Sequence, residues 1–202
     1  MFLIILIILL FSLFLYLFLR KKIILKKIKK YYQEGRDFVA IDLETTGINP
    51  KKDEIIEVGA YKFNIRGKKE EYSKLVNPQR ILPKEIIKLT KITQEMVENK
   101  PSFSEIKEEF CSFIGDSIIL GWNLAFDLAF LKRKGIKFKN PAYDVLKISK
   151  IILPKKINKK KRSFSLSAIA KDFNILVKER HRALADAKTL QEVFLKLIKL
   201  IN

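Results

Sequence analysis

Cysteine and histidine are the scarcest functional side chains in this chain of 202 residues, which has one of each. The single cysteine, Cys111, excludes a disulfide framework and is typical of a protein in a reducing compartment. Acidic residues are also few: the chain has 22 Asp and Glu and 41 Lys and Arg, which gives a formal net charge of +19. This imbalance favours a polyanionic partner, either nucleic acid or the anionic face of a membrane.

A long hydrophobic run is present only at the N-terminus. Residues 2–19 carry no charge and are apolar except for Ser12 and Tyr16, and about 20 such residues can span a bilayer as a helix. No basic segment precedes the run and no small-residue cleavage site follows it, so we expect an uncleaved anchor rather than a signal sequence that is removed. The residues that follow are basic, namely Arg20, Lys21, Lys22, Lys26, Lys27, Lys29 and Lys30. They predict a single-pass cell-membrane protein with its C-terminal part in the cytoplasm, and they would attract anionic lipid.

The rest of the chain has the pattern of one folded domain. We assign residues 1–19 to a transmembrane anchor, 20–36 to a basic juxtamembrane linker and 37–202 to this domain. Predicted strands begin at residue 39 and cover 55–63, 72–76 and 117–121. Predicted helices cover 84–89, 93–99, 103–114, 124–134, 142–153, 166–173 and 183–201, of which 142–153 is ambiguous. This order indicates an α/β or α+β domain with a mixed sheet.

Two carboxylates interrupt the first predicted strand. Side chains two residues apart on a strand point to the same face, so Asp42 and Glu44 converge on one spot. Two buried like charges are costly unless a cation neutralises them, and a hard divalent metal favours oxygen ligands. The plainer alternative, a strand end whose acids face water before the turn at Thr46 and Gly47, stays equally open on these residues alone.

Further acids and the one histidine lie at the ends of later apolar elements. Asp127 is a lone acid in an apolar helix that leaves a strand end, the edge at which open sheets bind ligands. His181 and Asp186 flank the start of the last predicted helix, and a histidine suits proton transfer from water. Each has a plainer explanation when taken singly: a narrow polar stripe, an exposed loop histidine, and an aspartate favoured by the helix dipole.

Taken together, these residues indicate a metal-dependent site. Four carboxylates can hold two divalent ions about 4 Å apart, a geometry that clamps both oxygens of an in-line phosphoryl displacement. The four are Asp42, Glu44, Asp127 and Asp186.

Three segments resemble the exonuclease motifs of the DEDDh family, which includes the epsilon proofreading subunit of bacterial DNA polymerase III. They are Asp42-Leu43-Glu44-Thr45-Thr46-Gly47, Asn123-x-x-Phe126-Asp127-x-x-Phe130-Leu131 and His181-x-Ala183-x-x-Asp186. The resemblance covers most of residues 37–202. It implies a ribonuclease H-like fold, with a mixed five-stranded sheet flanked by helices. It also implies metal-dependent 3′-to-5′ hydrolysis of nucleic acid, with DNA favoured, to nucleoside monophosphates.

The resemblance also implies a role for each motif residue. The ligands of two Mg²⁺ or Mn²⁺ ions would be Asp42, Glu44, Asp127 and Asp186. His181 would be the general base that deprotonates the attacking water. Contacts to the terminal nucleotide are assigned to Thr45, Thr46, Phe126 and Asn123, with Phe126 as a wall for the base.

Three features fall outside these assignments. Trp122 replaces a histidine found in many relatives, and we expect activity to survive because that histidine is not the general base. Asp144 is interpreted as a structural acid. A basic loop holds Lys155, Lys156, Lys159, Lys160, Lys161 and Arg162. This loop would either line the path of the substrate through phosphate contacts or form a solvated charge run.

The expected partners are single-stranded 3′ ends of DNA or RNA, and a membrane through residues 1–19 and the basic collar 20–30. A polymerase partner has no support in the residues. Two alternatives stay open: an RNA-directed exoribonuclease of the same family, and a non-catalytic membrane tether for nucleic acid. The complete set of five motif residues argues against the tether. DNA and RNA cannot be distinguished from the motifs, because contacts to a 2′-hydroxyl cannot be read from them.

Overall fold

A mixed sheet of five strands organises the protein, for which a computed structural model describes residues 2–154, 156–157, 160–177 and 180–201. The strand order is β3-β2-β1-β4-β5. The strands are β1 (Phe38–Thr45), β2 (Ile55–Phe63), β3 (Lys69–Leu75), β4 (Ile118–Gly121) and β5 (Ala142–Asp144). β1 pairs antiparallel with β2 and parallel with β4, and β5 continues the parallel side. The predicted mixed five-stranded sheet is therefore confirmed.

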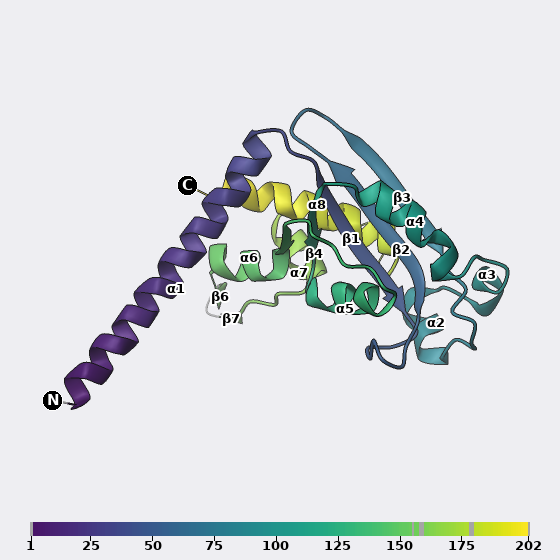
Figure 1. The fold of residues 1–202 in the computed structure, drawn as a ribbon, viewed down its shortest axis with the longest axis horizontal. Helices are drawn as coiled ribbons and strands as arrows, with labels where there is room; N and C mark the ends of the chain where they lie inside the picture. Colours follow the sequence, from purple (N-terminus) through teal and green to yellow (C-terminus); the bar gives the residue numbers. More distant parts are fainter. Residues whose placement is uncertain (1, 155, 158–159, 178–179, 202) are drawn as a thin grey trace.

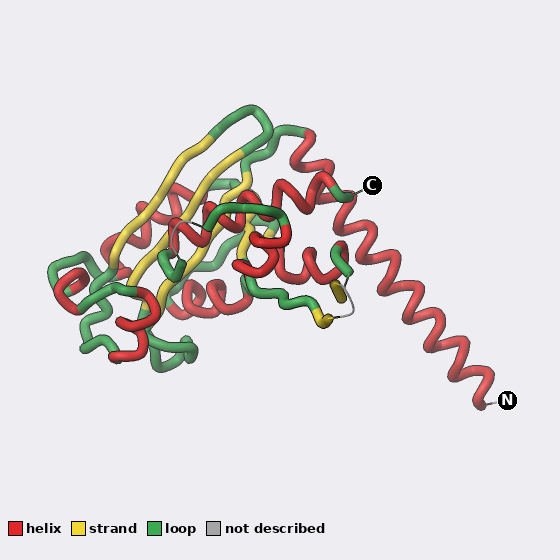
Figure 2. The backbone as a smooth tube through the Cα atoms, turned by 180° about the vertical axis from the view of Figure 1, so that it is seen from behind, coloured by secondary structure: helices red, strands yellow, loops and turns green. Residues whose placement is uncertain are grey.

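Helices cover both faces of this sheet, which is why its central strands are apolar on both sides. Phe38 and Ala40 of β1 belong to the hydrophobic cluster that includes α8 (Ala183–Lys199). Val39 and Ile41 point the other way, into a cluster with α4 (Phe103–Ile114) and α5 (Ala125–Arg133). Figure 1 shows α8 crossing the sheet, and Figure 2 shows the strands from behind. The first residues of α8 thereby lie against the strands that carry the predicted acids.

The remaining elements are short. They are α2 (Lys84–Thr90), α3 (Gln94–Val97), α6 (Val145–Ile152), α7 (Leu166–Asp172), β6 (Lys156–Ile157) and β7 (Lys160–Lys161). The predicted helix 142–153 is wrong at its start, because residues 142–144 pair with β4 as the edge strand β5. The helix begins only after Asp144, whose side chain accepts hydrogen bonds from the N–H groups of Leu146 and Lys147. The predicted basic loop is in part the hairpin β6–β7, while its residues Lys155 and Lys159 lie outside the described residues.

The N-terminal helix α1 (Phe2–Gln33) projects from the domain and is joined to it only by its last turns (Figure 1). Ile28 is fully buried and belongs to the same cluster as Phe38 and Phe194. The Lys29 ammonium donates a hydrogen bond to the carbonyl of Ile201. Most of the segment predicted as a linker is thus helix, and its end packs into the domain core.

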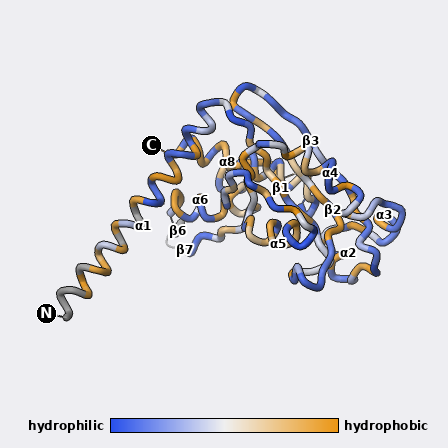
Figure 3. The backbone as a smooth tube through the Cα atoms, viewed as in Figure 1, coloured by the Kyte–Doolittle hydropathy of each residue, from blue (hydrophilic) through white to orange (hydrophobic). Residues whose placement is uncertain are grey.

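Large apolar side chains on the projecting part of α1 are exposed, among them Leu9, Phe11 and Tyr16. Figure 3 shows hydrophobic residues, in orange, recurring along this part of the helix. In the described part of the chain, no helix has the combination of length and apolarity needed to cross a membrane. The predicted transmembrane helix at residues 1–19 is therefore not confirmed. Met1 lies outside the described residues, as do the side chains at positions 2–5, 8, 14, 17 and 18.

Candidate active site

The C-terminal end of β1 supplies two acids to the face of the sheet that α8 covers. Asp42 and Glu44 follow Phe38 and Ala40 at alternate positions, so they point to the same face. Asp42 lies opposite Gly59 of β2, and Glu44 lies opposite Glu57. The pairing shifts between Glu44 and Thr45, where the strand leaves the regular ladder. The apolar strand thus ends in a carboxylate pair directed at the start of α8.

The loop before α8 brings the histidine to this pair. Ligand atoms of Glu44, His181 and Asp186 all lie within 4.8 Å of one another. The backbone N–H of His181 donates to Asp186 Oδ2 at 3.1 Å, and His181 has a left-handed φ of 57°. Such a conformation costs a non-glycine residue about 1–3 kcal/mol and persists only where its surroundings hold it.

The other two predicted acids complete the cluster. Asp42 lines one cavity with His181 and Asp186. Asp127, from the first turn of α5, is 2 % exposed and close enough to Asp42 to raise its pKa. The structure thus brings together all five residues predicted for catalysis and metal binding, from β1, α5 and the start of α8.

Burial and mutual repulsion disfavour the ionised forms of these acids. Burial, followed by repulsion from Asp127 and Glu44, raises the pKa of Asp42 well above its ordinary value. Burial and then the charge of Asp186 raise the pKa of Glu44 to about 8. Burial raises the pKa of Asp127 to about 8 and also raises that of Asp186. A divalent cation would remove this repulsion, so the donor set fits the metal that the motifs imply.

The cavity at this cluster has a volume of about 190 Å³. Besides Asp42, Asp186 and His181, its lining includes Trp122, Ser165, Ser167 and Arg180. Of these, only Trp122 stands out in the sequence, as a departure from the family pattern. The hydroxyl groups and the guanidinium are suited to sugar and phosphate, but they lie on α7 and in a loop, where no motif marks them.

The predicted nucleotide contacts at the end of β1 have hydroxyl groups that are already bonded within the protein. The hydroxyl of Thr45 donates to the carbonyl of Gly47 at 2.6 Å. That of Thr46 accepts from the N–H of Glu54 at 3.0 Å and reaches the Asp53 carboxylate at 3.4 Å. Both threonines are buried, so their hydroxyl groups shape the turn that follows the metal-binding acids.

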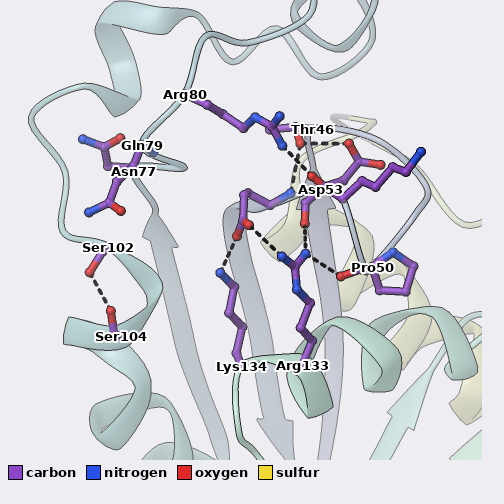
Figure 4. A network of polar contacts seen from close by, with 12 residues as sticks. Thr46, Pro50, Asp53, Asn77, Gln79, Arg80, Ser102, Ser104, Arg133 and Lys134 are labelled. Atoms are coloured by element: carbon purple, nitrogen blue, oxygen red, sulfur yellow. Dashed lines mark hydrogen bonds and ion pairs between the residues drawn. The ribbon is translucent and has the colours of Figure 1, made fainter.

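Cationic side chains tie this turn to its neighbours, as Figure 4 shows. Arg133 at the end of α5 donates to the carbonyls of Pro50 at 2.6 Å and Asp53 at 3.1 Å. Arg80 donates to the carbonyl of Lys52 at 2.5 Å, and Lys134 pairs with Glu54. The loop 46–54 is therefore held against α5 and against the segment that follows β3.

The other two predicted substrate residues lie near the start of α5. The Phe126 ring packs against Phe130 with a centroid distance of 5.0 Å. Asn123 is exposed, has a φ of 60°, and donates its N–H to Asp144 Oδ1 at 3.2 Å. Asp144 thus joins the motif loop to the start of α6, which agrees with the structural role predicted for it.

Sequence reasoning missed Glu57, a buried acid in the middle of β2. It is 1 % exposed, and its carboxylate accepts from Arg182 Nε and Nη2 and from the Ala183 N–H, at distances of 2.8 to 3.2 Å. A charged residue inside the apolar run 55–63 was the signal that could have identified it.

Similarity to known proteins agrees with this geometry. A family profile described as Exonuclease (RNase_T) matches residues 39–194. The DNA polymerase III subunit epsilon of Aquifex aeolicus is 35 % identical over 80 % of this chain and 80 % of its own length. A PolC-type DNA polymerase III of Thermotoga petrophila is 38 % identical over 84 % of this chain. The chain spans only 12 % of the length of that polymerase.

Solved structures agree on the fold. Exonuclease X in complex with 5′ overhanging duplex DNA superposes with a TM-score of 0.65 at 23 % identity, over 80 % of this chain and 91 % of the other. E. coli exonuclease I in complex with a dA16 oligonucleotide superposes with a TM-score of 0.67 at 18 % identity, over 82 % of this chain and 42 % of the other. At these identities the likeness concerns the fold.

Proposed function

Because this chain belongs to the exonuclease family, we propose that it hydrolyses nucleic acid from the 3′ end and releases nucleoside monophosphates. The observation that carries the proposal is the convergence of four carboxylates and the chain's only histidine. Asp42, Asp186 and His181 line one cavity. Glu44 has a ligand atom within 4.8 Å of those of His181 and Asp186, and Asp127 lies close to Asp42.

DNA is the favoured substrate, since the epsilon relative is named as a subunit of DNA polymerase III and the PolC-type relative as a DNA polymerase III. A structural neighbour is also described in complex with duplex DNA. An RNA-directed activity of the same site is the alternative.

The proposed mechanism uses two Mg²⁺ or Mn²⁺ ions and a histidine base. Asp42, Glu44, Asp127 and Asp186 would hold the ions, which supply stabilisation of the charge that develops at the phosphate. His181 would accept the proton of the attacking water, because a ring nitrogen of this residue lies within 4.8 Å of carboxylate oxygens of Glu44 and Asp186. Trp122 and Arg180 line the same cavity and would contact the terminal nucleotide.

The test is a comparison of DNA with RNA in the presence of Mg²⁺ or Mn²⁺. The full chain in detergent would be incubated with 5′-labelled single-stranded DNA, single-stranded RNA and a 3′-recessed duplex. Stepwise shortening from the 3′ end is expected, and it should be lost in Asp186→Asn. Asp116→Asn, an exposed aspartate after α4, is the matched control and should retain the activity. No shortening of any substrate by folded protein would refute the proposal, and preference for RNA would select the alternative.

We further propose that residues 1–19 attach the protein to the cell membrane, with the exonuclease domain in the cytoplasm. The support is the row of exposed large apolar side chains on the projecting part of α1, among them Leu9, Phe11 and Tyr16 at 61 %, 65 % and 59 % exposure. A soluble surface rarely leaves such a row uncovered. The basic residues of 20–30 follow it directly and suit anionic lipid head groups.

Cell fractionation tests this attachment. The full chain should sediment with membranes, and a chain that begins at residue 20 should not. Leu9, Phe11 and Tyr16 replaced together by serine should release the full-length protein, whereas serine at the exposed loop positions Ile48, Ile65 and Ile81 should not. Full-length protein in the soluble fraction would refute the attachment.

A further inference from the structure

Glu57 is a buried carboxylate beside the active site that the proposed mechanism does not use. It lies on β2 directly opposite Glu44 and is 1 % exposed. Both of its oxygens are engaged by the segment that follows His181. Oε1 accepts from Arg182 Nη2 at 2.8 Å and from Nε at 3.1 Å, and Oε2 accepts from the Ala183 N–H at 2.8 Å. A carboxylate with this set of partners is stable in the interior.

These bonds act on the residue next to the histidine. Arg182 is the N-cap residue of α8 and the immediate neighbour of His181. The strand therefore holds both the side chain of Arg182 and the backbone of Ala183. On the other side, the N–H of His181 donates to the Asp186 carboxylate. The strained left-handed backbone of His181 is thus fixed between a contact to β2 and a contact to α8.

Close packing adds to this attachment. A Cβ atom on Gly59, two residues along β2, would lie 2.1 Å from the carbonyl carbon of Ala183 and 2.2 Å from the Leu184 nitrogen. The start of α8 therefore rests directly on the backbone of β2. Since β2 is the neighbour of β1, its contacts to α8 determine how far His181 and Asp186 stand from Asp42 and Glu44.

We infer that Glu57 and Arg182 are positioning residues, which hold the His181 loop at the distance from Glu44 that catalysis requires. Glu57 does not touch the substrate in this assignment, and it acts only through Arg182 and the start of α8. The inference rests on the proposed function, because it takes His181 as the base.

The test uses the fact that His181 is the only histidine, so that it alone gives a signal in histidine-labelled protein. The full chain, prepared in detergent without a histidine tag, would carry ¹³Cε1-labelled histidine. Glu57→Gln keeps the shape of the side chain and removes its charge, and Arg182→Lys keeps the charge and removes the paired geometry. Glu57→Ala tests complete removal.

The matched control is Glu71→Gln. Glu71 on β3 pairs with Lys188 of α8 at 2.8 Å, the same distance as the pair formed by Arg182 and Glu57. This exposed pair also joins α8 to the sheet, but it does so beyond the first turn of the helix. Glu71→Gln therefore removes an ion pair between α8 and the sheet but keeps the contacts of Glu57 to Arg182 and Ala183.

In Glu57→Gln and Arg182→Lys, we expect the His181 signal to shift or broaden and kcat to fall by about tenfold or more, with KM within about twofold. Glu71→Gln should change neither quantity. A His181 signal and a kcat unchanged in both Glu57 variants would overturn the inference, and so would equal effects of Glu71→Gln. If the unmodified protein shortened no nucleic acid while its His181 signal still depended on Glu57, the proposed function would fail and the positioning would stand.

Discussion

Asp42 and Gly59 lie opposite each other on β1 and β2, and the missing side chain of Gly59 creates the space in which α8 begins. The acid and the glycine serve the same site from neighbouring strands. Asp42 supplies a carboxylate, and Gly59 allows the backbone of Ala183 to approach the sheet. The distance between the acids of β1 and the residues of α8 is therefore set by a residue with no side chain.

Replacement of Gly59 by alanine should move the start of α8, with His181 and Asp186, away from the acids of β1. The added Cβ would lie 2.1 Å from the carbonyl carbon of Ala183, and this atom cannot move unless the start of α8 moves with it. We expect the exonuclease rate to fall by about tenfold or more and the melting temperature to drop by several degrees. Exonuclease assays and thermal melts would measure both.

Gly115→Ala is the control for that substitution. Gly115 has a φ of 51°, and its new Cβ would meet only the Ser112 carbonyl, at 3.6 Å. It should therefore lower the stability by about 1 kcal/mol through backbone strain without a change in the exonuclease rate. Equal rates for the two variants would contradict the role given to Gly59.

Part of the candidate site could be predicted from the residues alone, because acids inside apolar elements stand out in the sequence. Asp42 and Asp127 interrupt apolar runs, and each needs a partner or a metal. Residue spacing along β1 also places Asp42 and Glu44 on one face, a relation that needs no tertiary information. The order of strands and helices likewise indicated the mixed sheet.

What could not be predicted depends on contacts between segments far apart in the chain. The edge strand β5 has three residues and is defined by its pairing with β4, whereas its local pattern resembles the helix that follows. Ile28 and Phe194, from the two terminal helices, belong to one hydrophobic cluster. The hydrogen bonds that join the hydroxyl groups of Thr45 and Thr46 to Gly47 and to residues 53–54 are likewise marked by no sequence pattern.

The acids of the site should make the metal-free protein less stable as the pH rises. A carboxyl whose pKa is raised from 4.5 to about 8, as in Glu44, binds more protons in the folded state than in the unfolded state between these values. The stability it contributes is complete below about pH 4.5 and is lost as the pH rises through about 8. Thermal melts in EDTA from pH 5 to pH 9 should show a falling melting temperature.

Metal should reverse this trend, because a cation favours the ionised carboxylates. Saturating Mn²⁺ should raise the melting temperature most at high pH. Glu44→Gln should stabilise the metal-free protein at pH 8, by on the order of 1–3 kcal/mol, and should weaken the effect of Mn²⁺. Glu108→Gln, an exposed glutamate on α4, is the control and should change neither. A metal-free melting temperature that rises from pH 5 to pH 9 would contradict this account.

The end of α1 should be necessary for the stability of the exonuclease domain. Ile28 is fully buried against the core, so Ile28→Ala should lower the free energy of unfolding by about 2–4 kcal/mol. Ile23 lies on the same helix but is 65 % exposed, and Ile23→Ala should have little effect. Urea unfolding of both variants in the same detergent would measure the difference. If both had the same midpoint, the helix end would not be part of the core.

Arg133 should fix the turn that follows the metal-binding acids. Its guanidinium donates to the carbonyls of Pro50 and Asp53, and the loop 46–54 begins only two residues after Glu44. Loss of these bonds would loosen the turn but leave the acids in place, so Arg133→Ala should raise KM several-fold, with kcat within about threefold. Lys132→Ala removes the exposed cation of the preceding residue and is the control for lost attraction to nucleic acid. Titration of a single-stranded DNA substrate at two salt concentrations separates the two effects. A rise in KM that is equal in both variants and disappears at high salt would show that Arg133 acts by its charge alone.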